Sequence, residues 1–274
     1  MAAPIPNPED SVSRQDNAKT FRDLHTGPIL VLPNAWDAAS ARLVEHAGAK
    51  AVATTSAGMA WSLGVPDGGH LDRATAIAAL ARITGAVTVP VTADIEGGYD
   101  DLAETVTQLL AAGVVGVNIE DSAAARLLDV DDHAARLAIV RDTAAEAGVD
   151  LFVNARIDVH FFGDGQLSTT LRRAEAYLAA GADGIFVPGV ADPDAIATLA
   201  KEIDAPLNIM AGTGSPTVAE LADLGVARVS VGQGIAEAAY AVVRDSATRL
   251  LTTGAYQVGG VDYGQMNELL SRGA

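Results

Sequence analysis

The sequence contains no cysteine among its 274 residues. Disulfide bonds, thiolate metal sites and a cysteine nucleophile are therefore excluded. The chain also lacks any run of about 20 apolar residues, which a helix needs to cross a bilayer. Its first residues lack the basic-then-apolar order of a signal peptide. We therefore expect a cytoplasmic protein with no membrane partner.

Positive charge is scarce as well. The chain has 18 Lys and Arg against 35 Asp and Glu, which gives a formal net charge of -17. Nucleic acids bind to basic patches, so this balance argues against a nucleic-acid partner. It does not argue against an anionic small molecule, because the charge around a site can oppose the net charge.

One pattern recurs along the chain: an alanine-rich helical stretch ends at glycine, and a short apolar strand follows. It occurs in EHAGAKAVATTS, LLAAGVVGVNIED, EAGVDLFVNARID, LAAGADGIFVPG and ADLGVARVSVGQG. Glycine supplies the left-handed residue that ends many helices. Such alternation of helices and strands indicates a parallel sheet.

Eight strands are predicted in all, and their starts leave room for one helix after each. The strands are ILVLPNA, AVATTSA, VPVTADIE, GVNIED, LFVNARID, GIFVPG, LNIMAG and RVSVGQG. The helices are predicted over 38–46, 73–84, 102–111, 132–147, 170–180, 192–202, 217–224 and 235–251. Eight such units in one domain predict an α/β fold, a (β/α)₈ barrel of the TIM type. A doubly wound sheet is the competing fold, but no Gly-x-Gly-x-x-Gly follows the first strand.

The ends of the chain fall outside this repeat. We predict an N-terminal arm over 1–27, either loose or a short helix, the barrel over 28–252, and a tail over 253–274 that carries a short helix. The segment 122–131, after the fourth strand, is a candidate mobile loop.

Polar residues collect where the strands end, which is where a (β/α)₈ barrel carries its active site. Asp94 and Glu96 close the third strand, Glu120 the fourth and Arg156 the fifth. Residues two apart on a strand share a face, so Asp94 and Glu96 are expected to point the same way. Glu120 follows the neighbouring strand, so the three carboxylates are expected to converge.

Three close carboxylates repel one another unless a cation lies among them. Oxygen ligands without His or Cys suit Mg²⁺ or Mn²⁺, and Mg²⁺ keeps several waters, so some acids are expected to bind through water. Arg156 offers a forked donor for a carboxylate or phosphonate. Taken singly, each acid has an ordinary alternative as a helix N-cap or a loop ion pair, and Asp67 in its glycine-rich loop has one as a cap or turn residue.

Longer stretches carry a resemblance to a known family. PNAWDAASARLVEHAGAKAVATTSAGMAWSLGVPD, ADIEGGY, GVNIED, NARID and RAEAYLAAGADGIFVPG follow one another between Leu32 and Leu251. Their order and spacing resemble the isocitrate lyase and phosphoenolpyruvate mutase superfamily. The resemblance implies a Mg²⁺-dependent barrel that cleaves or forms C–C or P–C bonds next to an enolate. It also implies a homo-oligomer, a dimer or tetramer that exchanges its last barrel helix between subunits.

The resemblance assigns roles to single residues. The metal group falls on Asp94, Glu96 and Glu120, with Glu96 in place of the usual aspartate. The substrate-binding positions fall on Thr55, Ser56, Ala57, Arg156 and Gln233. The catalytic positions fall on Asp67 and Arg156.

The stretch after the fourth strand departs from the family. The isocitrate and methylisocitrate lyases carry a lid with a Lys-Cys-Gly-His core there, whereas this chain continues EDSAAARLLDVDD. We therefore predict a Mg²⁺-dependent lyase on a small 2-oxo or 2-hydroxy di- or tricarboxylate, such as oxaloacetate, an alkylmalate or a methylisocitrate-like acid. The alternatives are a P–C bond enzyme, a phosphonopyruvate mutase or hydrolase, and a non-catalytic 2-oxo acid binder.

Overall fold

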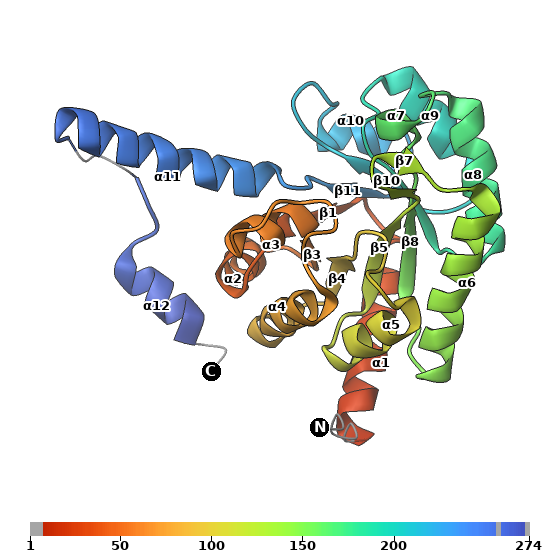
Figure 1. Cartoon of the computed structure of the whole chain (residues 1–274), viewed down its shortest axis with the longest axis horizontal. Coiled ribbons are helices and arrows are strands. Elements are labelled where there is room, and N and C mark those ends of the chain that lie inside the picture. Colours follow the sequence, from red (N-terminus) through yellow and green to blue (C-terminus); the bar gives the residue numbers. More distant parts are fainter. Residues whose placement is uncertain (1–7, 256–258, 272–274) are drawn as a thin grey trace.

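The protein is a closed parallel barrel, seen in a computed structural model that describes residues 8–255 and 259–271 (Figure 1). Its main sheet has the order β1-β11-β10-β9-β8-β5-β4-β3-β2. The outermost strands β1 (Leu30–Leu32) and β2 (Asn34–Ala35) belong to one stretch of chain, interrupted at Pro33. Proline has no N–H to give to a ladder, so it accounts for the break. The sheet therefore closes on itself, and β1 and β2 together form the first of eight barrel strands.

Eight strands alternate with eight helices, which confirms the predicted (β/α)₈ fold. The other strands are β3 (Val52–Thr54), β4 (Val91–Asp94), β5 (Gly116–Glu120), β8 (Phe152–Arg156), β9 (Gly184–Val187), β10 (Leu207–Met210) and β11 (Arg228–Ser230). The helices are α2 (Ala38–His46), α4 (Arg73–Ala86), α5 (Leu102–Ala111), α6 (Val130–Glu146), α8 (Leu167–Ala179), α9 (Pro193–Glu202), α10 (Val218–Asp223) and α11 (Gly234–Thr253).

Glycine ends the helices as the sequence predicts. In all five recurring αβ junctions the glycine has a positive φ, which a residue without Cβ adopts freely. These glycines are Gly48, Gly113, Gly148, Gly181 and Gly225, with φ between 69° and 100°. The strands that follow are buried, so every junction turns the chain from the outer layer back into the core.

Three further elements lie in the loops at the carboxyl ends of the strands. They are the helices α3 (Ser56–Ser62) and α7 (Val159–Phe162), and the antiparallel hairpin of β6 (Ser122–Ala123) with β7 (Arg126–Leu127). The hairpin occupies the segment predicted as a mobile loop. That segment is thus ordered as a small hairpin, and its mobility stays a prediction.

The opposite end of the barrel is closed by α1 (Pro8–Asp23), which is longer than the loose arm or short helix expected there. Phe21 is fully buried, with its ring 5.7 Å from that of Phe152. Arg22 donates to Asp183 at 2.8 Å and to Asp150 at 2.7 Å. Apolar burial and ion pairs thus hold this helix across the base of the barrel.

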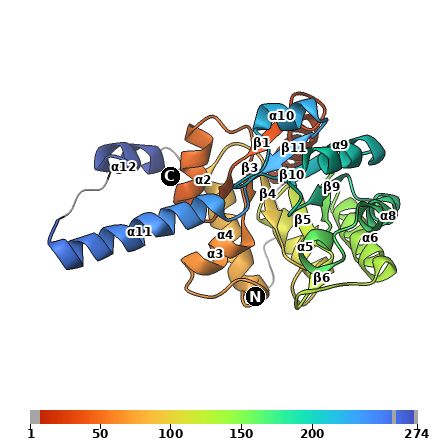
Figure 2. The ribbon, with the colours of Figure 1, turned by 90° about the horizontal axis from the view of Figure 1, so that it is seen from above.

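The C-terminal part leaves the body of the molecule. Figure 1 shows α11 extending outward, and Figure 2 shows α12 (Tyr263–Ser271) set beside α2. Arg42 fixes α12 by donating to the carbonyl of Leu269. We propose the division predicted from the sequence: an arm over 1–27, the barrel over 28–252 and a tail over 253–274. Across the described residues, no helix combines the length and apolarity needed to cross a membrane.

Candidate active site

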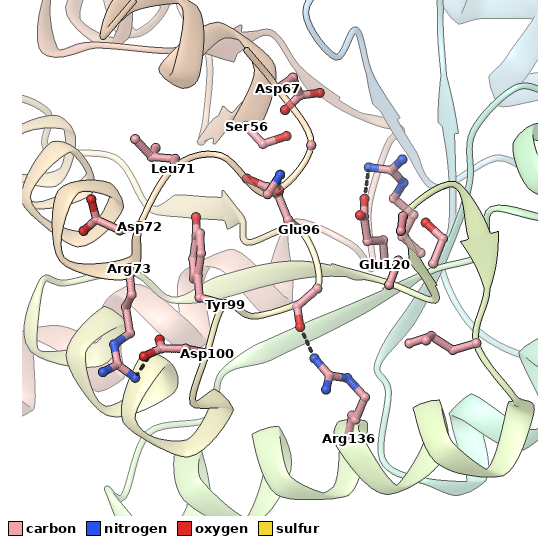
Figure 3. A pocket seen from close by; sticks show the side chains of 18 of the residues that line it. Ser56, Asp67, Leu71, Asp72, Arg73, Glu96, Tyr99, Asp100, Glu120 and Arg136 are labelled. Carbon is pink, nitrogen blue, oxygen red and sulfur yellow. Dashed lines mark hydrogen bonds and ion pairs between the residues drawn. The ribbon is translucent and has the colours of Figure 1, made fainter. Parts of the chain in front are cut away.

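A cavity of about 1030 Å³ opens at the carboxyl ends of β3, β4, β5 and β8 (Figure 3). Its lining combines acids, three arginines and small residues of the hairpin. The residues used below are Ser56, Asp67, Glu96, Glu120, Ser122 and Arg156. These belong to different strand ends and loops, so only the closed barrel brings them together.

Asp94 is the last residue of β4 and is bonded to two residues of this lining, Ser56 and Glu96. Its Oδ2 accepts from Ser56 Oγ at 3.3 Å, and its Oδ1 accepts from the backbone N–H of Glu96 at 3.2 Å. Burial raises the pKa of Asp94, and the guanidinium of Arg156 opposes that shift. A buried carboxylate with so few donors favours a cation or a proton beside it.

Glu96 lies two residues beyond Asp94, but the strand has already ended. Its φ is 50°, a left-handed conformation that is uncommon for a residue with a side chain. The strand alternation used to place it beside Asp94 therefore does not apply to it. Its Oε2 instead accepts from the backbone N–H of Gly69 at 2.6 Å, in the loop that carries Asp67. Burial raises the pKa of Glu96, and Asp94 and Asp67 add to the shift.

Glu120 and Arg156 are direct cross-strand partners on β5 and β8. Arg156 Nη1 lies 2.8 Å from Glu120 Oε2 and 4.0 Å from Asp94 Oδ2. Burial raises the pKa of Glu120 to about 8 despite the opposing effect of Arg156. The site thus gathers buried carboxyl groups whose ionisation is disfavoured by burial and only partly supported by Arg156.

Asp158 completes the surroundings of Arg156. Its Oδ1 accepts from Arg156 Nε at 2.7 Å, and its Oδ2 accepts from Ser122 Oγ at 2.6 Å. No role for Asp158 was predicted from the sequence. Its position two residues after Arg156 was the one available signal, because it indicates the same side of the chain.

Next to Asp158 lies a second buried ion pair, which was not predicted from the sequence. Asp121 accepts from Arg173 and from the hydroxyl of Tyr177, each at 2.8 Å, and from the backbone N–H of Asp158. Arg173 and Tyr177 come from α8, about 50 residues further along the chain, so no local pattern could have predicted their contact with Asp121.

The residues fit a Mg²⁺ ion held partly through water. Among the described residues, no three His, Asp or Glu side chains are arranged closely enough to hold a metal ion by themselves. Mg²⁺ commonly binds one or two carboxylates and keeps several waters, so it does not require such a cage. The hard oxygen donors and the raised pKa values of Asp94, Glu96 and Glu120 suit a cation at this mouth.

The remaining predicted residues divide into two groups. Asp67 and Ser56 line the cavity, whereas Thr55, Ala57 and Gln233 are not among its lining residues. Thr55 is the N-cap of α3, and its hydroxyl accepts from the N–H of Gly58 at 3.4 Å. The hydroxyl that faces the site therefore belongs to Ser56 rather than to Thr55. Gln233 precedes α11 as its N-cap residue and makes no capping bond.

Comparison with known proteins shows which family this chain is similar to. The sequence profile of the family described as phosphoenolpyruvate phosphomutase matches residues 21–251. An uncharacterized protein of Mycobacterium tuberculosis is 42% identical over 219 residues, which cover 78% of this chain and 81% of that protein. A 2-methylisocitrate lyase of Bacillus subtilis is 29% identical over 208 residues, covering 71% of this chain and 67% of that enzyme.

A solved structure is similar over almost the whole fold. A Burkholderia cenocepacia J2315 protein, provisionally named a lyase/mutase, superposes with a TM-score of 0.89 at 36% identity. The match covers 94% of this chain and 96% of that one. The similarity therefore includes the barrel together with its loops and most of its terminal segments.

Proposed function

The chain belongs to the phosphoenolpyruvate phosphomutase family, and from this premise we propose that it is a Mg²⁺-dependent carbon–carbon lyase. Its proposed substrate is a small 2-oxo or 2-hydroxy acid with two or three carboxylates. One observation carries the proposal: the buried carboxyl groups of Asp94 and Glu120, both with raised pKa values, lie within 4.0 Å of Arg156 at the barrel mouth. The relatives of this family include lyases and mutases that act on small molecules.

The proposed metal group is Asp94, Glu96 and Glu120. Mg²⁺, or Mn²⁺ in its place, would stabilise the negative charge that develops on the C2 oxygen when the bond next to it breaks. The chain contributes the oxygen donors and keeps them in place. Ser56 donates to Asp94, and Gly69 donates to Glu96.

The proposed substrate contacts lie on both sides of this group. Arg156 has a rigid forked guanidinium that suits a second carboxylate of the substrate. Ser56 and Ala57 open α3, so their backbone N–H groups have no acceptor within the helix and suit the first carboxylate. Thr55 supports them by capping the helix. Asp67 is proposed as the group that orients bound water or moves a proton.

A P–C bond enzyme is the second candidate, and the family description favours it, because that description names a phosphomutase. A phosphonate would occupy Arg156 as a carboxylate does. The products separate the candidates: phosphoenolpyruvate or phosphate would indicate P–C chemistry, and pyruvate or glyoxylate would indicate C–C cleavage. A non-catalytic binder would retain 2-oxo acids and Mg²⁺ without turnover.

A homo-oligomer is the proposed assembly, either a dimer or a tetramer. Helix α11 supports it, because its apolar side chains are exposed on the single chain, among them Val242, Val243 and Leu251. Exposed apolar patches of this kind mark protein interfaces. Sedimentation of the full chain tests this, and a monomer at micromolar concentration would contradict it.

The experiment that tests the activity is a turnover screen with and without Mg²⁺. Its substrates are oxaloacetate, 2-alkylmalates, 2-methylisocitrate, isocitrate and phosphonopyruvate. We expect turnover of one carboxylic acid that stops when EDTA is added and returns with excess Mg²⁺. Turnover that persists unchanged in EDTA would contradict the metal dependence.

A further inference from the structure

The first residue of the hairpin is bonded to the aspartate that holds Arg156. Ser122 Oγ donates to one oxygen of Asp158 at 2.6 Å, and Arg156 Nε donates to the other at 2.7 Å. Asp158 is fully buried and Ser122 is only 3% exposed, so water hardly competes for the Ser122–Asp158 bond. Two short hydrogen bonds thus connect the hairpin to the guanidinium.

The base of the hairpin is held in place by α8. Asp121 precedes the hairpin and Leu128 follows it, and the N–H of Leu128 donates to the carbonyl of Asp121 at 2.8 Å. Arg173 donates to the carboxylate of Asp121 and to the carbonyl of Leu128, both at 2.8 Å. Both ends of the hairpin are therefore fixed, and Ser122 lies directly next to this fixed base.

The tip of the hairpin lies against the cavity. Ala123, Ala124 and Ala125 line it, and the φ angles of Ala124 and Ala125 are 48° and 59°. Alanine side chains neither donate nor accept protons. The tip therefore contributes backbone groups and shape to the cavity. Both contributions depend on the position of the hairpin.

Arg156 and the hairpin cannot move independently if these bonds persist. The guanidinium is a rigid plane, so a shift of its Nη atoms toward an anion also shifts Nε. Nη1 is 2.8 Å from Glu120 Oε2, a partner that an incoming anion would have to displace or share. Nε is bonded to Asp158, and Asp158 to Ser122.

From this geometry we infer that Ser122 and Asp158 are positioning residues that couple anion binding at Arg156 to the placement of the hairpin over the cavity. The inference rests on the proposed function, since it takes Arg156 as the anion-binding residue. It assigns a role to the Ser122 hydroxyl through its bond to Asp158.

Limited trypsin digestion tests the coupling, because Arg126 is exposed in β7 and provides a cleavage site within the hairpin. The probe is oxalate with Mg²⁺, and its binding is measured in parallel by calorimetry. In the parent protein, we expect saturating oxalate to slow cleavage after Arg126. In Ser122→Ala, this protection is lost, and the Kd for oxalate rises about 3- to 10-fold, the effect of one lost hydrogen bond.

The decisive quantity is the ratio of cleavage rates without and with oxalate. If Ser122 only stabilised the hairpin, Ser122→Ala would be cleaved faster in both conditions and the ratio would stay as in the parent, which would overturn the inference. Ser215→Ala is the matched control, because Ser215 bonds Gly212 in an exposed loop away from the cavity, and it should keep the parental ratio.

A second variant covers the case in which Ser122→Ala does not fold. Asp158→Asn keeps the shape of the link but removes the charge that holds Arg156, so a smaller protection ratio is expected, and an unchanged ratio overturns the inference. If the parent binds oxalate but gains no protection, the coupling is wrong and the proposed function stands. If the parent binds no oxalate with Mg²⁺, the proposed function fails and the coupling fails with it.

Discussion

Glu96 accepts a hydrogen bond from the backbone N–H of Gly69 at 2.6 Å. The bond connects the loop after β4 to the loop that carries Asp67, and both loops line the cavity. Aspartate is usual at position 96 in the family that the chain resembles, and it is one methylene shorter. The additional methylene of Glu96 therefore lets its carboxylate reach the backbone N–H of Gly69 and hold the loop that carries Asp67.

Shortening this side chain should release the loop. In Glu96→Asp we expect amide exchange over residues 64–71 to accelerate roughly 10-fold or more, since hydrogen bonds to charged groups contribute about 1.5–3 kcal/mol. Hydrogen–deuterium exchange followed by mass spectrometry measures it. Glu96→Gln is the comparison variant, because its amide oxygen still accepts from Gly69 but carries no charge, so exchange should accelerate less than in Glu96→Asp. Equal exchange in Glu96→Asp and the parent would show that this bond does not hold the loop.

Asp94 is the acid on which the metal proposal depends most. Asp94→Asn should abolish detectable Mg²⁺ binding by calorimetry and lower kcat by about 100- to 1000-fold, as expected when charge stabilisation in a transition state is removed. Asp72→Asn removes a carboxylate from the rim of the same cavity but retains an N-cap for α4, so it should change neither quantity appreciably. Mg²⁺ binding by Asp94→Asn at parental affinity would refute the assignment.

The barrel could be predicted because its signals are local and repeated. Each glycine-ended helix and each apolar strand is encoded within about a dozen residues, as in LLAAGVVGVNIED. The strand-end position of the site followed from the fold, and the cross-strand pairing of Glu120 with Arg156 agrees with it.

What the sequence could not predict depends on single dihedral angles and on distant partners. The left-handed φ of Glu96 ends the strand alternation on which its predicted direction rested. Whether Thr55 or Ser56 presents its hydroxyl depends on where α3 begins, because the N-cap uses its own hydroxyl. The Asp121–Arg173 pair joins residues 52 positions apart, and no spacing rule connects them.

That pair should be important for stability. Arg173 is 6% exposed and Asp121 is fully buried, so removing one partner leaves the other charge buried and unpaired. Arg173→Leu should therefore lower the free energy of unfolding by about 3–5 kcal/mol. Lys19→Ala breaks an ion pair with Asp23 in which both side chains are exposed, and should leave stability unchanged within error. Urea denaturation of the three proteins makes the comparison, and a similar midpoint for Arg173→Leu and the parent would contradict it.

His133 should make the protein less stable in mild acid. It is fully buried, its ring centroid lies 4.8 Å from that of Tyr177, and neither ring nitrogen has a hydrogen-bond partner among the described residues. Burial lowers the pKa of His133 to about 3, while nearby Arg136 and Arg173 contribute to the shift.

The sign of the pH effect follows from proton binding. Between pH 6.5 and 3 the unfolded chain protonates this histidine and the folded protein does not, so acid favours unfolding. The free energy of unfolding should therefore fall by about 1.4 kcal/mol per pH unit below 6.5 because of His133. Glu120 acts in the opposite direction, since its raised pKa lets the folded protein hold the extra proton.

Comparing His133→Leu with the parent isolates the histidine, because Glu120 is present in both. Urea unfolding at pH 7.5, 6 and 5 should show the parent losing about 2 kcal/mol more than His133→Leu by pH 5. Parallel pH profiles for the two proteins would mean that His133 has the same pKa in the folded protein as in the unfolded chain.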